Sequence, residues 1–285
     1  MAVQSIEEQT QFDYETKTWG GHDVKLAPTY LGAMRLKYCL EDLQNVQGKV
    51  LEVGCGAGGM ARAIKAYRPD LQVFGCDVSR QALATARQQS REVVFDFGDA
   101  YDLPYDPGTF SAVVMFDVLE HLDEPGTSVA EINRVLQNKG TFHLFVPCEG
   151  ELHALHGLLA KIGWRAKEIY GGHIQGFTLP DVKEILWSSG FQVPKTRWSA
   201  HLINQLADVA YFTLLSMKGS NTRSSVEGYL AETETSLFRS LVSGAKATIA
   251  MASFYESLLL AAFPGSGAHL IAVKSGKSEV ANGGM

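Results

Sequence analysis

Short apolar segments alternate with amphipathic segments through the middle of the chain. Five apolar runs, each bordered by turn-forming residues, have the length and composition of buried strands: residues 49–53, 71–76, 93–98, 111–116 and 141–146. Helical spacing of apolar residues marks three of the segments between them: residues 60–68, 79–89 and 125–136. Ser79 is the expected N-cap of the second helix, and residues 138–140 are expected to end the third. Because parallel strands need crossover connections, this alternation predicts a doubly wound parallel sheet.

Beyond Pro147 the regular alternation ends and helical patterns dominate. Helices are predicted over residues 149–170 and 179–189, and over most of residues 201–263 with a break around 219–225. Two further strands are predicted near residues 191–198 and at 269–274. The helical region is rich in Leu, Ala, Phe and Tyr, which favours either an apolar acceptor pocket or simple packing in the core or a dimer face.

The sequence LEVGCGAGG joins the first predicted strand to the first predicted helix. Glycines allow a sharp turn there and a close approach of a ligand, and free N–H groups at a helix start favour an anionic ligand group. Gly54, Gly56 and Gly59 match the spacing of the dinucleotide-binding fingerprint. Glu52, Gly54, Gly56 and Gly58 also match the first motif of the methyltransferases. The loop alone does not separate these two interpretations.

Acidic residues at the next two strand ends separate them. Asp77 ends the second strand, where a carboxylate binds ribose hydroxyls in either interpretation. Asp99 ends the third strand within GDAYDLP, and a second acid placed to meet an adenine amino group belongs to the methyltransferase pattern. The fourth strand then runs into FDVLEHL. Taken in order, these motifs resemble the class I (Rossmann-like) S-adenosylmethionine-dependent methyltransferases, in particular the family that includes the ubiquinone and menaquinone biosynthesis enzymes.

The resemblance covers residues 49–146, with a shorter match at 172–191. It implies an α/β fold: a doubly wound, mostly parallel seven-stranded sheet with helices on both faces, an antiparallel last strand and a helical insertion that forms a cap. One departure is Ser111 after Phe110, where the family usually has Phe-Asp, and it lies outside the cofactor pocket.

The resemblance also implies S-adenosylmethionine as cofactor, and it assigns cofactor contacts residue by residue. The methionine half would lie against the glycine loop, the ribose at the end of the second strand, the adenine at the end of the third strand, and the sulfonium near the end of the fourth. In chain order the implied contact residues are Glu52, Gly54, Gly56, Gly58, Asp77, Val78, Asp99, Ala100, Phe116 and Asp117.

Two histidines are candidates for contact with the methyl acceptor. His173 lies in a glycine-rich loop of the second matching segment, and His121 follows the fourth strand at the edge where ligands bind in open α/β sheets. For His121, packing or capping of a helix is the favoured explanation. His153 and His156 would share a helix face, but with no third ligand in sight they favour a solvated or pocket-lining face, so no metal site is predicted. Glu149 is a further candidate for the pocket.

Two features of the N-terminal region leave alternatives open. Tyr14, Trp19 and Tyr30 would form either a lid over the cofactor or a hydrophobic clamp onto the core. Arg35 would either meet the cofactor carboxylate or be a surface charge.

Composition and charge narrow the class of partner. The formal net charge of −6 and the lack of any run of Lys or Arg argue against nucleic acid as substrate. The apolar segment 241–263 contains Lys246 and Glu256, and a charge in the middle of a membrane helix costs about 2.5–3.5 kcal/mol, so a buried or cap-forming helix is the better interpretation. The polar N-terminus lacks the pattern of a signal peptide, which favours a cytoplasmic location. Peripheral membrane contact, and the choice between monomer and homodimer, stay open.

The chain is therefore expected to contain an N-terminal helical lid (1–47), a cofactor-binding core (48–148), a helical acceptor-binding cap with one core strand near 191–198 (149–265), and a last strand with a disordered tail (266–285). The predicted function is methyl transfer to a small, apolar or amphiphilic molecule such as a quinone, isoprenoid or lipid precursor. The alternatives are an NAD-dependent oxidoreductase and a cofactor-binding protein without turnover.

Overall fold

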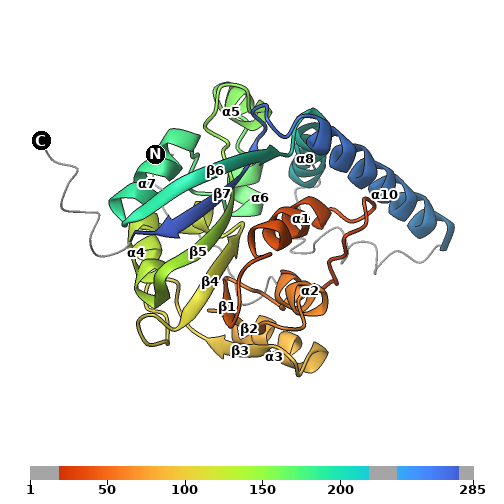
Figure 1. Cartoon of the computed structure of the whole chain (residues 1–285). Coiled ribbons are helices and arrows are strands. Elements are labelled where there is room, and N and C mark those ends of the chain that lie inside the picture. Colours follow the sequence, from red (N-terminus) through yellow and green to blue (C-terminus); the bar gives the residue numbers. More distant parts are fainter. Residues whose placement is uncertain (1–18, 218–235, 276–285) are drawn as a thin grey trace, which may run out of the picture.

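A single mixed sheet organises the protein, whose computed structural model describes residues 19–217 and 236–275 (Figure 1). The strand order is β3-β2-β1-β4-β5-β7-β6. Strands β1 to β5 pair in parallel, and β7 runs antiparallel to both of its neighbours, β5 and β6. This arrangement confirms the predicted fold class. The strands are β1 (Lys49–Val53), β2 (Gln72–Asp77), β3 (Val94–Phe97), β4 (Phe110–Phe116), β5 (Leu136–Pro147), β6 (Phe191–Ser199) and β7 (Gly267–Lys274).

Helices cover both faces of this sheet (Figure 1). The bounds of the helices in the first part of the chain are α1 (Ala33–Asp42), α2 (Gly59–Tyr67), α3 (Arg80–Gln89), the short 3-10 helix η1 (Leu119–His121) and α4 (Pro125–Val135). Those of the later helices are α5 (Leu155–Ala160), α6 (Ala166–Gly171), α7 (Leu179–Ser188), α8 (Leu202–Met217) and α10 (Ser236–Leu259). Helices α1, α2 and α3 pack with one face of the sheet in one hydrophobic core, and α4 and α7 pack with the other face in a second core.

The central strand shows why the apolar runs predicted the sheet so directly. Strand β4 lies between β1 and β5, and all but one of its residues are buried, because helices cover it from both sides. A strand covered on both faces reads as a continuous apolar run. Ser79 caps α3 as expected, since its Oγ accepts a hydrogen bond from the N–H of Ala82 at 3.1 Å.

Two boundaries differ from the prediction. Residues 138–140 do not separate α4 from the fifth strand: β5 begins at Leu136, directly after α4, and contains them. The turn signal is accommodated inside the strand, where Lys139 has a φ of 62° and the pairing with β4 shifts register. Residues 149–170 are also not one helix, because turns precede α5 and Gly163, with a φ of 90°, lies between α5 and α6.

Helices α5, α6, α8 and α10 belong to the region predicted to form a cap, and α6 lies near the carboxyl end of β4 (Figure 1). Helix α8 packs against α5, α6 and α10, and α10 also contacts α1. The break predicted around 219–225 and the predicted disordered tail at 276–285 lie outside the described residues, as does Tyr14. Of the helices in the described parts of the chain, none is both long and apolar enough to cross a bilayer, although α10 contains most of the apolar segment 241–263.

Replacing Thr178 by alanine is expected to lower the free energy of unfolding by about 1 kcal/mol, because Thr178 and Asp181 form a reciprocal capping box at the start of α7. Asp181 Oδ2 accepts the N–H of Thr178 at 2.8 Å. Urea unfolding would measure the change. Thr85→Ala is the matched control, since the exposed Thr85 hydroxyl lies inside α3 and bonds only to its own helix. An equal loss in both variants would contradict the capping role.

Candidate active site

The glycine loop between β1 and α2 has the backbone shape that only glycine adopts easily. Gly54, Gly56 and Gly58 have φ angles of 72°, 52° and 78°. The loop is also tightly packed. A Cβ on Gly56 would lie 2.5 Å from the backbone oxygen of Trp19, and a Cβ on Gly54 would overlap the side chain of Val118. The glycines are therefore required both by the turn and by neighbours on either side.

The expectation of free N–H groups in this loop is wrong for residues 54–58. The N–H groups of Gly54 and Cys55 donate to Cys76 O, and that of Gly58 donates to Cys55 O. The N–H of Gly56 donates to Asp77 Oδ2 at 2.7 Å, and that of Ala57 donates to the oxygen of Trp19 at 2.8 Å. A ligand group that accepted hydrogen bonds from these N–H groups would have to displace the bonds that they already make.

The two acids predicted to hold the nucleoside lie at neighbouring strand ends. The backbone oxygen of Asp77 accepts a hydrogen bond from the N–H of Gly98 at 3.2 Å. This bond links the end of β2 to the residue before Asp99. The Asp77 carboxylate supports the glycine loop through Gly56 and accepts the N–H of Ser79 at 2.8 Å. Asp99 is exposed, and its Oδ1 accepts the N–H of Tyr101 at 3.0 Å. Both carboxylates are thus held in fixed positions by backbone N–H groups.

Glu52 lies beneath this loop, only 4% exposed. Burial raises the pKa of its carboxyl to about 8, with a further contribution from the charge of Asp77, while the N–H of Ala61 and the charge of Arg62 oppose the shift. Its carboxyl faces the start of α2, which places it behind the glycine loop.

The remaining predicted cofactor residues lie around the same edge. Val78 is 42% exposed, Ala100 is half-buried, and Phe116 is packed into the core. Asp117 has a φ of 50°, and its Oδ1 accepts a hydrogen bond from Arg35 Nη2 at 2.9 Å. The guanidinium of Arg35, on α1, therefore pairs with the residue that follows β4. The two roles expected from the sequence, a contact with the cofactor carboxylate or a surface charge, did not include this pairing.

The structure brings the two candidate histidines together. The ring centroids of His121 and His173 are 4.9 Å apart. His121 Nδ1 contacts Gly172 O at 2.8 Å. The N–H groups of Ile174 and Gln175 both donate to the backbone carbonyl oxygen of Glu120. The loop that carries His173 is therefore fixed onto η1. Burial lowers the pKa of His121 to about 4, and the nearby His173 adds to the shift.

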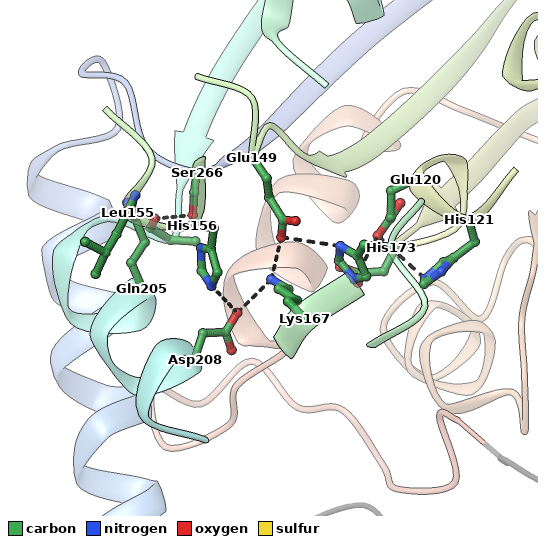
Figure 2. A network of polar contacts seen from close by, with 12 residues as sticks. Glu120, His121, Glu149, Leu155, His156, Lys167, His173, Gln205, Asp208 and Ser266 are labelled. Atoms are coloured by element: carbon green, nitrogen blue, oxygen red, sulfur yellow. Dashed lines mark hydrogen bonds and ion pairs between the residues drawn. The ribbon is translucent and has the colours of Figure 1, made fainter. Parts of the chain in front are cut away.

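A chain of buried charges leads away from this pair into the cap (Figure 2). His173 Nδ1 lies 3.3 Å from Glu149 Oε1, and the same oxygen lies 2.6 Å from Lys167 Nζ. Lys167 also contacts Asp208 Oδ2 at 2.9 Å. Burial alone would raise the pKa of Glu149, but the ammonium of Lys167 and the neighbouring His173 outweigh it and lower the pKa below its ordinary value. These contacts join the end of β5 to α6 and α8.

Glu120 is the most deeply buried acid of the site, with no exposed surface. Burial raises the pKa of its carboxyl well above the ordinary value, and the charges of Asp117 and Glu149 add to the shift. Its Oε1 lies 3.9 Å from the Nε2 atoms of both His121 and His173.

Sequence reasoning identified the histidines and Glu149 but not Glu120, Lys167 or Asp208. An acid directly beside His121, within an otherwise apolar LEHL segment, was the available signal for Glu120. Nothing in the sequence pairs Lys167 with Asp208, which lie on separate helices.

His153 and His156 do not form a pair. His153 precedes α5 and contacts Gly265 O at 3.1 Å, whereas His156 lies 3.8 Å from Asp208 Oδ2.

Comparison with known proteins gives this geometry its context. A family described as "Methyltransferase domain" matches residues 51–144, which include the glycine loop, Asp77, Asp99 and the His121 segment. The chain is a class I S-adenosylmethionine-dependent methyltransferase. These matches are all to methyltransferases, so they do not favour the NAD-dependent oxidoreductase that the glycine spacing alone had left open.

Named relatives support this assignment, and a solved structure shares the fold. The methyltransferase is 28% identical to ajmaline N-methyltransferase of Rauvolfia serpentina over 227 residues, which is 76% of this chain and 77% of the relative. It is 32% identical to demethylmenaquinone methyltransferase of Thermotoga maritima over 92 residues, or 32% of this chain and 40% of the relative. The structure of the [4+2]-cyclase SpnF shares the fold, with a TM-score of 0.56 and 22% identity over 85% of this chain and 80% of that one.

Proposed function

We propose that this methyltransferase acts on a small, apolar or amphiphilic molecule that binds between the glycine loop and the His121–His173 pair. One contact carries the proposal: Val118 packs directly against Gly54. The segment that follows β4 therefore runs from the cofactor loop to His121 within a few residues, and a methyl donor and its acceptor need to lie that close. The cap helices α6 and α8 cover the same edge through Lys167 and Asp208.

The cofactor roles proposed here are those implied by the sequence. Asp77 and Asp99, at adjacent strand ends, are suited to the ribose and the adenine, and the glycine loop is suited to the methionine half. Glu52 supports the loop from behind. Val78, Ala100, Phe116 and Asp117 complete the proposed lining.

Two observations favour an apolar or amphiphilic acceptor. Relatives carry names such as ajmaline N-methyltransferase and demethylmenaquinone methyltransferase, whose substrates are small molecules. The cap also exposes large apolar side chains on α8 and α10, among them Leu206, Leu214, Met251 and Tyr255. A quinone, isoprenoid or lipid precursor has the matching chemistry.

S-adenosylmethionine supplies an electrophilic methyl group, and its sulfur keeps the electron pair of the broken carbon–sulfur bond. The chain has to orient the acceptor atom, exclude water and, where that atom carries a proton, receive the proton. His121 donates its Nδ1 proton to Gly172 O, which leaves Nε2 as the basic nitrogen of the ring. We propose that His173 and His121 contact the acceptor from this side.

Replacing Asp77 by asparagine is expected to weaken binding of S-adenosylhomocysteine about 10- to 100-fold, because a charged acceptor for the ribose hydroxyls is lost. Calorimetric titration would measure the change, with NAD titrated in parallel. Asp106→Asn is the matched control, since Asp106 is an exposed acid that precedes β4 at the opposite edge of the sheet. Preferential binding of NAD by the unaltered protein, or no uptake of S-adenosylhomocysteine, would refute the proposed function.

A further inference from the structure

Glu120 differs from the other acids around the histidine pair in having no cationic partner. Asp117 pairs with Arg35, and Glu149 and Asp208 share Lys167. No Lys or Arg in the described parts of the chain lies within 4.0 Å of the Glu120 carboxylate, and neither of its oxygens has a hydrogen-bond partner there. A fully buried carboxylate without partners costs several kcal/mol, so this position favours a ligand that supplies positive charge.

Both histidines turn the same nitrogen toward this carboxylate (Figure 2). Each Nε2 lies 3.9 Å from Glu120 Oε1. The Nδ1 atoms point the other way, toward Gly172 O at 2.8 Å for His121 and toward Glu149 Oε1 at 3.3 Å for His173. An imidazole whose Nδ1 donates to a carbonyl, as that of His121 does, presents its Nε2 lone pair, which is how metal-binding histidines are usually held.

We infer that Glu120, His121 and His173 form a binding site for a divalent transition metal ion of the zinc type. The donor atoms of the three side chains lie within 4.8 Å of one another. Ligands at zinc distances of about 2.0–2.1 Å are separated by roughly 3.0–3.4 Å, so side-chain rotations that close the triangle by about 1 Å complete the site. Two imidazoles favour a transition metal over Mg²⁺, which prefers oxygen ligands.

The inference goes beyond methyl transfer and departs from the sequence analysis, which predicted no metal. The sequence pattern offered only His153 with His156 and no third ligand. The structure instead brings His173 next to Glu120 and His121, which lie much earlier in the chain. Three protein ligands leave a coordination position open, as in catalytic metal sites. An ion there would polarise an acceptor oxygen, and the imidazoles would then act through the ion rather than as free bases.

Metal uptake by the tag-free, full-length protein tests the inference. After treatment with a chelator and its removal, Zn²⁺ is titrated in competition with a chromophoric chelator, and Co²⁺ binding is followed by its visible absorption. The expected result is one Zn²⁺ per chain and a Co²⁺ spectrum typical of nitrogen and oxygen ligands, with no competition from equimolar Mg²⁺. Glu120→Gln and His173→Gln are each expected to weaken Zn²⁺ binding at least tenfold.

The control and the parallel measurements separate the possible failures. His153→Gln removes a histidine that contacts Gly265 O elsewhere in the cap, and it is expected to leave the affinity unchanged. Circular dichroism checks the fold; should Glu120→Gln unfold, His173→Gln decides alone, because His173 is partly exposed. No stoichiometric uptake, or uptake that neither site variant weakens, overturns the metal site. S-adenosylhomocysteine binding is measured on the same samples, so loss of the metal site and failure of the proposed function are distinguished.

Discussion

Replacing Asp42 by alanine is expected to lower the free energy of unfolding by about 3–5 kcal/mol, because it leaves a buried cation and a buried histidine without their shared partner. Asp42 Oδ2 contacts His143 Nδ1 at 2.7 Å and also accepts a hydrogen bond from Arg197. The side chains of Asp42, His143 and Arg197 are 2%, 0% and 9% exposed. These contacts anchor α1 to β5 and β6, so the loss weakens the attachment of α1 to the sheet.

Denaturant unfolding monitored by circular dichroism would measure the effect, with midpoints compared at similar slopes. Glu41→Gln is the matched control. Glu41 pairs with the same Arg197, at 2.7 Å, but is 41% exposed, and partly exposed ion pairs contribute about 1 kcal/mol or less. If Asp42→Ala cost no more than Glu41→Gln, the buried pairing would not be what holds α1 in place.

Replacing Gly56 by alanine is expected to weaken S-adenosylhomocysteine binding about 100-fold, which corresponds to about 2.7 kcal/mol. The φ of 52° disfavours any residue with a Cβ, and the added carbon would lie 2.5 Å from the backbone oxygen of Trp19. Relief of that overlap has to move either the loop or residue 19. Movement of the loop breaks the hydrogen bond from Gly56 N–H to Asp77. Movement of residue 19 breaks the hydrogen bond from Ala57 N–H to the backbone oxygen of Trp19.

Calorimetric titration measures this affinity, and Gly108→Ala provides a control with a similar backbone penalty. Gly108 has a φ of 69°, but a Cβ there meets no atom within 4 Å, and the residue precedes β4 at the far edge of the sheet. The control is expected to lose some stability and no affinity. Equal affinity in the Gly56→Ala and unaltered proteins would show that the tight contact with Trp19 does not shape the binding site.

The sequence predicted the parts of the fold that depend on local pattern. Strand β4 could be found because both of its faces are covered, and α3 because Ser79 marks its start. Residues 138–140 misled the prediction because a turn signal also fits an irregular position within a strand, as Lys139 shows. Residues 149–170 read as one helix because helical spacing continues across Gly163.

The site could be predicted to a similar depth. Residues at strand ends were found because parallel strands bring their carboxyl ends to one edge, and Asp77 and Asp99 follow that rule. The buried polar contacts were not found, because each joins residues far apart in the chain. Lys167 meets Glu149 and Asp208 only after α6 and α8 have packed, and no local pattern encodes that meeting.

Strand β7 has a consequence for synthesis of the protein. It lies between β5 and β6, and it is the neighbour through which β6 joins the sheet. A nascent chain that has not yet released residues 267–274 from the ribosome therefore holds β5 with an open edge and β6 with no place in the sheet. Open strand edges promote association between chains. Termination before residue 267 would therefore leave an unpaired edge on β5, which favours association between chains.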